Sequence, residues 1–327
     1  MKVEQFPGAI CMSLTPRDIF RQVAVFGMML ALCMIAAAND FDGDRKADPA
    51  MFRPSTGVWY LNGAESKSSF AAFRWGVETD VLVPGDYDGD GEADIAVWRP
   101  ENGNWHIRCS GEGQLLTFHW GRTTIHPTGG LADVPVTGDY DGDGLNDIAV
   151  WRPDSGEWLI LMTSKGYNPE VKRWGMLGDV PVQADYDGDG STDIAVFRPM
   201  ENRWYILESK TGNWQVRTFG RAGDDLLVPA DYTGDGKADL AVYDRGNWTV
   251  LNSETQEVEP FEFGFADAIP VPADYDGDGV TDFAVYEKGK WFVYESDSSR
   301  FKTYSFGRTN DVPVNSLAAK QSIVAVP

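Results

Sequence analysis

Acidic residues recur at fixed spacing in one short segment of the chain. Its clearest copy reads Asp86-Tyr87-Asp88-Gly89-Asp90-Gly91-Glu92-Ala93-Asp94, with carboxylates at loop positions 1, 3, 5 and 9 and glycines at positions 4 and 6. Carboxylates this close repel one another unless a cation lies between them. Ca²⁺ takes six to eight oxygen ligands at about 2.3–2.6 Å, and glycine permits the positive-φ turns that wrap a backbone around an ion. The segment therefore predicts a calcium-binding loop.

Six copies of this loop start at residues 40, 86, 139, 185, 231 and 274, and each is expected to hold one Ca²⁺. Position 7 is expected to contribute its backbone carbonyl, as in an EF-hand loop, so its side chain varies. The loops are not EF-hands, because position 12 carries no Glu and strand-like residues follow. The predicted ligands are Asp40, Asp42, Asp44 and Asp48; Asp86, Asp88, Asp90, Glu92 and Asp94; Asp139, Asp141, Asp143, Leu145 and Asp147; Asp185, Asp187, Asp189, Ser191 and Asp193; Asp231, Thr233, Asp235, Lys237 and Asp239; and Asp274, Asp276, Asp278, Val280 and Asp282.

Two loops depart from the pattern, and the weakest calcium binding is expected there. Position 3 of the fifth loop is Thr233, which removes one charge, and position 6 of the first loop is Arg45 instead of glycine. A bulky residue is strained at positive φ, and the cation of Arg45 would lie beside the metal. The alternative, above all for the loop at Asp40, is an acidic Asx-type turn without an ion.

The first 38 residues resemble a secretory signal peptide. Arg17 and Arg21 precede an apolar run, Val23–Ala38, that ends in three alanines. A basic region, an apolar region and an A-x-A cleavage site in this order predict removal of residues 1–38. The mature domain, 39–327, would then have no transmembrane span and would be secreted, extracellular or periplasmic, with attachment at the cell surface as a further possibility.

Cysteine usage fits that location. Cleavage would remove Cys11 and Cys33, so Cys109 alone would remain and the mature chain would have no internal disulfide. Calcium would be the stabilising cross-link instead, at the affinity of about 10⁻⁴–10⁻³ M that is common in extracellular modules. Three alternatives stay open: an uncleaved membrane anchor, a lipid on Cys33, and a true start at Met12.

The segments between the loops also repeat, with a period in the forties that indicates a solenoid, a propeller or an array. A Val-Pro-like stretch precedes each loop, such as Val134–Val136 or Val228-Pro229, and an apolar run such as Ile148–Trp151 follows it. The apolar run is typical of a strand buried on both faces. A strand led by tryptophan and a last strand that ends in aromatic-glycine complete the repeat. Four short strands per repeat, without a helical pattern, predict an all-β fold of four-stranded propeller blades.

The chain ends predict how the ring closes. The first repeat has no strand before its loop, whereas Asp311–Val314 after the sixth repeat supplies a spare one. Pairing them closes a six-bladed ring and hides both sheet edges. A seven-bladed ring is the alternative, because Ser322–Pro327 resembles a further strand. The tryptophans that lead the third strands are expected to form the core between blades; they are Trp59, Trp105, Trp158, Trp204, Trp248 and Trp291.

These motifs resemble the FG-GAP/VCBS repeat family. The match is Asp-Tyr-Asp-Gly-Asp-Gly-x-x-Asp-Ile-Ala-Val, with Phe219-Gly220 and Phe306-Gly307 in the place of "FG", and it covers nearly all of residues 40–314. The resemblance implies an integrin α-like propeller with calcium in the loops between the first and second strands, although those propellers have seven blades. Trp98-Arg99-Pro100 is similar to bacterial secreted members. Adhesion or ligand capture is implied less directly, because a fold does not determine a function.

A partner is expected on the face opposite the calcium loops, where Arg122–Ala132 forms a longer connection than its counterparts. Three histidines lie in this repeat, and scattered or packed side chains are favoured over a zinc or catalytic cluster; they are His106, His119 and His126. Three arginines at turns of this face either attract an acidic glycan or, as we expect, pair with neighbouring carboxylates; they are Arg99, Arg152 and Arg198.

Composition and motifs then narrow the function. A net charge of −22 argues against a nucleic-acid partner, and the acidity is expected to serve bound metal. We favour a monomeric, secreted, calcium-binding module for adhesion or ligand binding, whose ligand is a glycan or a protein. The alternatives are an extracellular polysaccharide lyase or hydrolase and a purely structural surface protein. No acid–base carboxylate pair, serine elbow or cysteine–histidine pattern supports an enzyme.

Overall fold

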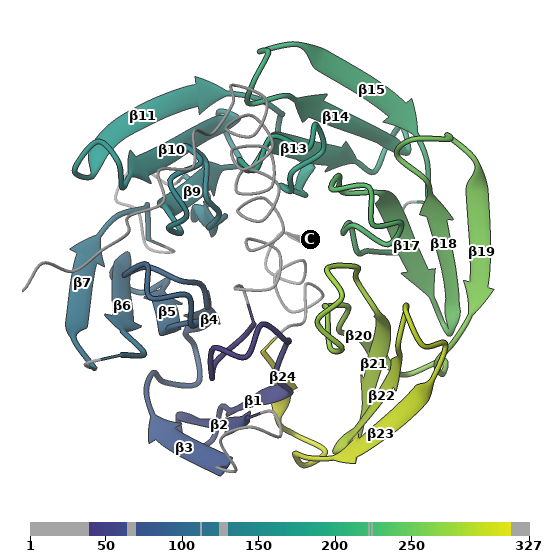
Figure 1. Ribbon diagram of the computed structural model, residues 1–327. Coiled ribbons are helices and arrows are strands. Elements are labelled where there is room, and N and C mark those ends of the chain that lie inside the picture. The colour runs from purple at the N-terminus through teal and green to yellow at the C-terminus, as the bar shows by residue number, and fades with distance from the viewer. Residues whose placement is uncertain are drawn as a thin grey trace, which may run out of the picture.

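The computed structural model describes residues 39–63, 70–111, 113–123, 130–221, 223 and 225–314. Within these residues, 24 strands form six four-stranded antiparallel sheets that stand in a ring around a common axis (Figure 1). The chain is therefore a six-bladed β-propeller, as its repeat predicts. The predicted signal peptide and Ser322–Pro327 lie outside the described residues. A membrane-crossing helix is not found in the described part of the chain.

Each blade contains a two-residue first strand and three longer strands. Blade 1 consists of β24 (Val312–Pro313), β1 (Ala50–Arg53), β2 (Val58–Asn62) and β3 (Phe70–Arg74). Blades 2 and 3 consist of β4 (Val81–Leu82), β5 (Ile95–Arg99), β6 (Asn104–Arg108) and β7 (Leu115–His119), and of β8 (Val134–Pro135), β9 (Ile148–Arg152), β10 (Glu157–Met162) and β11 (Asn168–Arg173). Blade 4 consists of β12 (Val180–Pro181), β13 (Ile194–Arg198), β14 (Arg203–Leu207) and β15 (Trp214–Thr218). Blades 5 and 6 consist of β16 (Leu226–Leu227), β17 (Leu240–Asp244), β18 (Asn247–Leu251) and β19 (Val258–Glu262), and of β20 (Ile269–Pro270), β21 (Phe283–Glu287), β22 (Lys290–Tyr294) and β23 (Phe301–Ser305).

Burial falls from the second strand of a blade to the fourth. In blade 2, four successive residues of β5 are buried, β6 alternates between buried and half-buried residues, and β7 alternates between exposed and half-buried ones. The fourth strands form the outer rim of the ring (Figure 1). The second strand is covered by neighbouring blades on both faces, which explains its uninterrupted apolar run.

The core lies between blades. All six tryptophans that lead the third strands are 0% exposed, and the buried clusters combine residues of adjacent blades, such as Trp105 of blade 2 with Val150 of blade 3. Each indole N–H donates to the main-chain carbonyl of the aromatic residue that follows the fourth strand of the same blade, as from Trp105 to Trp120 at 3.0 Å. The predicted role of these tryptophans as core between blades is confirmed, and each buried N–H has a partner.

Two strand boundaries differ from the prediction. The first strand of blade 5 is Leu226–Leu227, so the expectation that Val228-Pro229 forms it is wrong. Val228 lies just after the strand, where its N–H still donates to the carbonyl of Ala241 at 2.9 Å. Spacing from the acidic loop decides the register here, since the first strand starts five residues before the loop in blades 2 to 6. The fourth strands also end one residue before the aromatic-glycine pair.

The last described residues close the ring as predicted. Strand β24 pairs with β1 through Phe52 opposite Val312 and Met51 opposite Pro313. The N–H of Val314 donates to the carbonyl of Ala50 at 2.9 Å, which repeats the bond between Val83 and Ala96 in blade 2. The same closing segment brings a buried aspartate, Asp311, to the guanidinium of Arg53, where two N–H groups each donate to a carboxylate oxygen at 2.7 Å. Closure therefore combines sheet pairing with an ion pair.

Removing the closing strand is expected to destabilise the whole ring. A chain that ends at Asn310 loses β24 and leaves the guanidinium of Arg53 without its carboxylate partner, at a cost of about 3 kcal/mol or more. The denaturant midpoint of this chain should fall well below that of a chain that ends at Val314, which keeps the strand. Equal midpoints for the two truncated chains would contradict the assigned closure.

Candidate metal centres and the opposite face

The backbone of each acidic loop is organised by its first aspartate. In the second loop, Asp86 Oδ1 accepts a hydrogen bond from the N–H of Gly89 at 2.6 Å, and its Oδ2 accepts one from Gly91 at 3.0 Å. Both glycines have positive φ, 81° and 85°. The antiparallel bridge between Gly85 and Asp94 holds the two ends of the loop together. Glycine at positions 4 and 6 thus allows the turn that directs backbone N–H groups at one carboxylate.

The last aspartate of the loop is held by the connection between the third and fourth strands of the same blade. Asp94 Oδ2 accepts from the N–H of Tyr87 at 2.9 Å, and its Oδ1 accepts from the N–H of Ser110 at 2.8 Å. The hydroxyl of Ser110 also donates to Asp90 Oδ2 at 2.8 Å. Corresponding hydroxyl residues bond to positions 5 and 9 in five blades; they are Ser110, Thr163, Ser209, Ser253 and Ser296.

Sequence reasoning missed these five residues. The signal was a serine or threonine one or two positions after each tryptophan-led strand, repeated from blade 2 to blade 6.

Carboxylate oxygens from positions 1, 3 and 9 converge in three loops, where they lie within 4.8 Å of one another. These groups are Asp40, Asp42 and Asp48; Asp139, Asp141 and Asp147; and Asp185, Asp187 and Asp193. In the second loop, positions 1, 3 and 5 converge in the same way. Buried carboxylate oxygens without a hydrogen-bond partner include Asp48 Oδ1 and Asp141 Oδ1. An all-oxygen donor set with buried, unsatisfied acceptors fits a hard divalent cation such as Ca²⁺.

Electrostatics lead to the same conclusion. Burial, reinforced by neighbouring carboxylates, raises the pKa of Asp48 to about 8 and the pKa values of Asp94 and Asp282 to about 7. Hydrogen bonds from backbone N–H groups oppose this rise but do not cancel it. Carboxylic acids with such pKa values are held in an environment that disfavours their charge, and a bound cation would remove the penalty.

The six loops are joined to one another around the axis. The N–H at position 8 of each loop donates to the carbonyl at position 1 of the preceding loop, at 2.5–2.7 Å. The donors and acceptors are Ala93 to Asp40, Asn146 to Asp86, Thr192 to Asp139, Ala238 to Asp185, Thr281 to Asp231, and Ala47 to Asp274. This closed circle of six hydrogen bonds places every candidate metal centre next to two others.

The side chain at position 7 has a packing role in this circle. A Cβ added at Gly89 would lie 3.4 Å from Leu145 Cδ1, and one added at Gly234 would lie 2.8 Å from Val280 Cγ2. Position 7 of one loop therefore covers the glycine at position 4 of the preceding loop. The predicted contribution of its backbone carbonyl to calcium stays a prediction.

Comparison with known proteins agrees with this geometry. The family model of the FG-GAP-like repeat matches residues 86–150 and 185–242, which cover the acidic loops and second strands of blades 2 to 5. These two segments of the chain are therefore similar to FG-GAP-like repeats. No curated protein sequence matches it at a significant level.

Three solved structures resemble this chain to different degrees. A lectin of Agrocybe aegerita that recognises non-reducing terminal N-acetylglucosamine has a TM-score of 0.54 at 18% identity, over 84% of this chain and 82% of the lectin. A functionally unknown protein from Desulfotomaculum acetoxidans has a TM-score of 0.48 at 11% identity, over 80% of each chain. Apo AztD of Citrobacter koseri has a TM-score of 0.49 at 12% identity, over 80% of this chain and 83% of AztD. At such identities the likeness to the lectin concerns the fold.

The two atypical acidic loops keep the common backbone but differ in detail. Arg45 has a φ of 70°, and its N–H donates to Asp40 Oδ2 at 2.7 Å, as glycine does in the other loops. The predicted positive φ at this position is confirmed. In the fifth loop, the hydroxyl of Thr233 donates to Asp239 Oδ1 at 3.3 Å. A hydroxyl therefore stands where the other loops carry a carboxylate. The weaker calcium binding expected at this loop stays a prediction.

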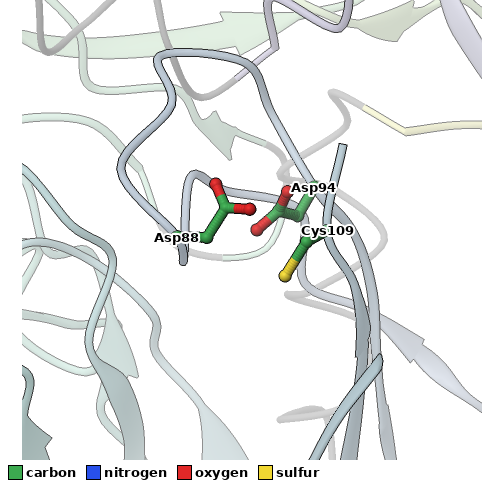
Figure 2. A group of neighbouring side chains, drawn as sticks. All are labelled: Asp88, Asp94 and Cys109. Carbon is green, nitrogen blue, oxygen red and sulfur yellow. The ribbon is translucent and has the colours of Figure 1, made fainter. Parts of the chain in front are cut away.

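Cys109 lies beside the second loop, a placement that the sequence did not reveal. Figure 2 shows the carboxylates of Asp88 and Asp94 pointing toward one another, with the Cys109 thiol next to them. The cysteine is free and buried. Burial, together with the charges of Asp94 and Asp88, raises its pKa to about 12, so the thiol is neutral at physiological pH. Since Ca²⁺ prefers oxygen, Cys109 acts as a neutral neighbour of this centre.

On the opposite face, the predicted arginines pair with buried aspartates. Arg99 binds Asp80 with two hydrogen bonds of 2.8 and 2.9 Å, and the same two-pronged contact joins Arg198 to Asp179. Arg152 binds Asp133 at 3.0 and 3.1 Å. Pairing with neighbouring carboxylates, the favoured interpretation, is therefore correct, and these guanidinium groups do not form a ring of uncompensated positive charge.

The histidines of blade 2 differ in their surroundings. His119 is exposed, and its Nδ1 lies 3.0 Å from Asn104 Oδ1. His106 is half-buried, and burial together with the charge of Arg99 lowers its pKa. His126 and most of the long connection around it lie outside the described residues.

Protons and Ca²⁺ compete for the same carboxylate oxygens. We therefore predict that the stability of the metal-free protein and the stabilisation by Ca²⁺ change in opposite directions with pH. In metal-free protein, aspartates with pKa values of about 7 to 8 instead of 3.8 bind more protons folded than unfolded. The free energy of unfolding should therefore fall as pH rises from about 4 to 8. Stabilisation by Ca²⁺ should grow over the same range, because its ligands must be deprotonated.

Thermal unfolding of chelator-treated and calcium-saturated protein at pH 5 and pH 8 measures both effects. At a hundredfold excess over Kd, each occupied centre adds roughly 2.7 kcal/mol, so the Tm at pH 8 should rise by several degrees. A Tm at pH 8 that calcium leaves unchanged would contradict the assignment of these loops as metal centres.

Replacing Arg45 with glycine is expected to improve the first loop. The substitution removes a left-handed backbone strain of about 1–2 kcal/mol and a cation beside the candidate ligands. Arg45→Gly should raise the Tm without metal and increase it further with Ca²⁺. Arg45→Ala is the matched control, because it removes the charge but keeps most of the strain; if both variants match the parent in Tm and calcium affinity, the first loop has been misinterpreted.

Proposed function

We propose that this protein is a secreted, calcium-stabilised β-propeller that binds glycans outside the cell. The observation that carries the proposal is the closed circle of acidic loops, in which oxygens of several aspartates converge in at least four loops. Such centres remain filled only where calcium is near 10⁻⁴–10⁻³ M, which is typical of extracellular modules. The signal-like residues 1–38 support the same location.

The glycan part has separate support. The lectin of Agrocybe aegerita shares the propeller fold and recognises a terminal N-acetylglucosamine, and propellers present connections on both faces and at the junctions between blades. A protein ligand is the second possibility that the sequence leaves open. We assign no catalytic reaction, because the clustered carboxylates belong to the loops or to arginine pairs, and we expect the protein to be a monomer.

A glycan array with calcium-saturated protein tests this proposal. Binding to a defined set of glycans, with no new reducing or unsaturated ends after incubation with the same polysaccharides, is the expected result. Release of such ends would favour the lyase or hydrolase alternative. A folded, calcium-loaded protein that binds no glycan would overturn the glycan-binding role.

A further inference from the structure

The six junctions between blades are filled by the aromatic residue that follows each fourth strand. At three junctions this residue is tryptophan: Trp75, Trp120 and Trp174. Each indole N–H donates to a main-chain carbonyl in the third strand of the next blade, at His106, Leu159 and Tyr205, over 2.9–3.0 Å. The indole therefore both fills the junction and ties its two blades together.

The other three junctions carry phenylalanine, at Phe219, Phe263 and Phe306. Phenylalanine is smaller than tryptophan and has no N–H to donate. The surface is hollowed where two of these residues lie. A cavity of about 360 Å³ is lined by Phe219 between blades 4 and 5, and one of about 470 Å³ is lined by Phe263 between blades 5 and 6.

The larger hollow has an aromatic wall. Phe265 and Phe292 meet edge to face with ring centroids 5.0 Å apart, and Phe292 and Phe301 lie nearly parallel at 6.1 Å. Phe265 and Phe301 are 45% and 58% exposed. Exposed aromatic rings that gather in a concave site commonly mark a ligand-binding surface, because covering them removes apolar area from water.

Polar groups border the same hollow. Arg245 lies in the turn between β17 and β18, Asn247 begins β18, and Glu262 ends β19 directly opposite Asn247 in the strand register. The Nδ2 of Asn247 donates to the carbonyl of Asp244 at 3.0 Å, which fixes the orientation of the amide. Donors and acceptors thus stand beside a flat apolar wall, a combination found in small-molecule sites of about 300–1,000 Å³.

We propose that the hollow between blades 5 and 6 binds a pyranose residue of a neutral glycan. The inference rests on the proposed function and assigns its site. A pyranose ring has an apolar C–H face that matches the phenylalanine wall, and its hydroxyls both donate and accept at the polar border. A purely apolar ligand would match the aromatic wall but would make no hydrogen bond to the polar border. A net charge of −22 disfavours an acidic sugar.

Phe263→Trp tests the site by installing the residue that fills three other junctions. The variant should keep the fold and the Tm of the parent, and should lose at least tenfold in affinity for the neutral oligosaccharide bound most tightly on the array, measured by titration calorimetry. Phe306→Trp makes the same change at the junction of blades 6 and 1 and should retain affinity. Phe301→Ala, at an exposed ring, should also lose affinity with little change in Tm, and it decides the matter if Phe263→Trp does not fold.

The outcomes separate this inference from the proposed function. If Phe263→Trp and Phe301→Ala both bind the oligosaccharide as tightly as the parent protein does, the assigned site is wrong but the glycan-binding role stands. A parent protein that binds no neutral glycan would overturn both. The parent protein could instead bind no glycan but bind an aromatic peptide in the hollow, with Phe263→Trp abolishing that binding. This result would also contradict the assignment of a pyranose ligand.

Discussion

Mutual repulsion among buried aspartates is the constraint on which this propeller depends. Blades 1 to 4 each place several carboxylates within 4.8 Å of one another, and burial raises the pKa of the most enclosed ones to about 6–8. Backbone N–H groups compensate only part of this cost. The circle of hydrogen bonds between loops joins the backbone at each centre to the backbones of its two neighbours.

The two faces of the propeller differ in how their carboxylates are compensated. On the loop face, carboxylates gather close enough to one another to suit a divalent cation. On the other face, buried aspartates such as Asp80 and Asp179 each receive two hydrogen bonds from an arginine of the same blade. Truncating one member of such a pair would leave a buried charge alone, which costs more than the intact pair contributes. These arginines therefore belong to the framework.

Repetition makes the exceptions informative. Arg45 adopts the positive φ that glycine adopts in the other loops, which shows that the surrounding loop geometry overrides local preference. Phe263 stands where three of the other blades carry an indole, and a hollow with an aromatic wall lies beside it. In a fold built from equivalent units, a change at one position can alter a local site while the repeated scaffold is preserved.

Local patterns in the sequence were sufficient for the acidic loops, the strand order and the number of blades. Loop positions, alternating burial and a spare strand near residues 311–314 are properties of short segments, and repetition amplified each signal. The hydroxyl of Ser110, the thiol of Cys109, the Arg152–Asp133 pair and the hydrogen bonds between loops were decided by tertiary structure. They depend on which connections and blades become neighbours in the closed ring, and the chain pattern alone does not specify those distances.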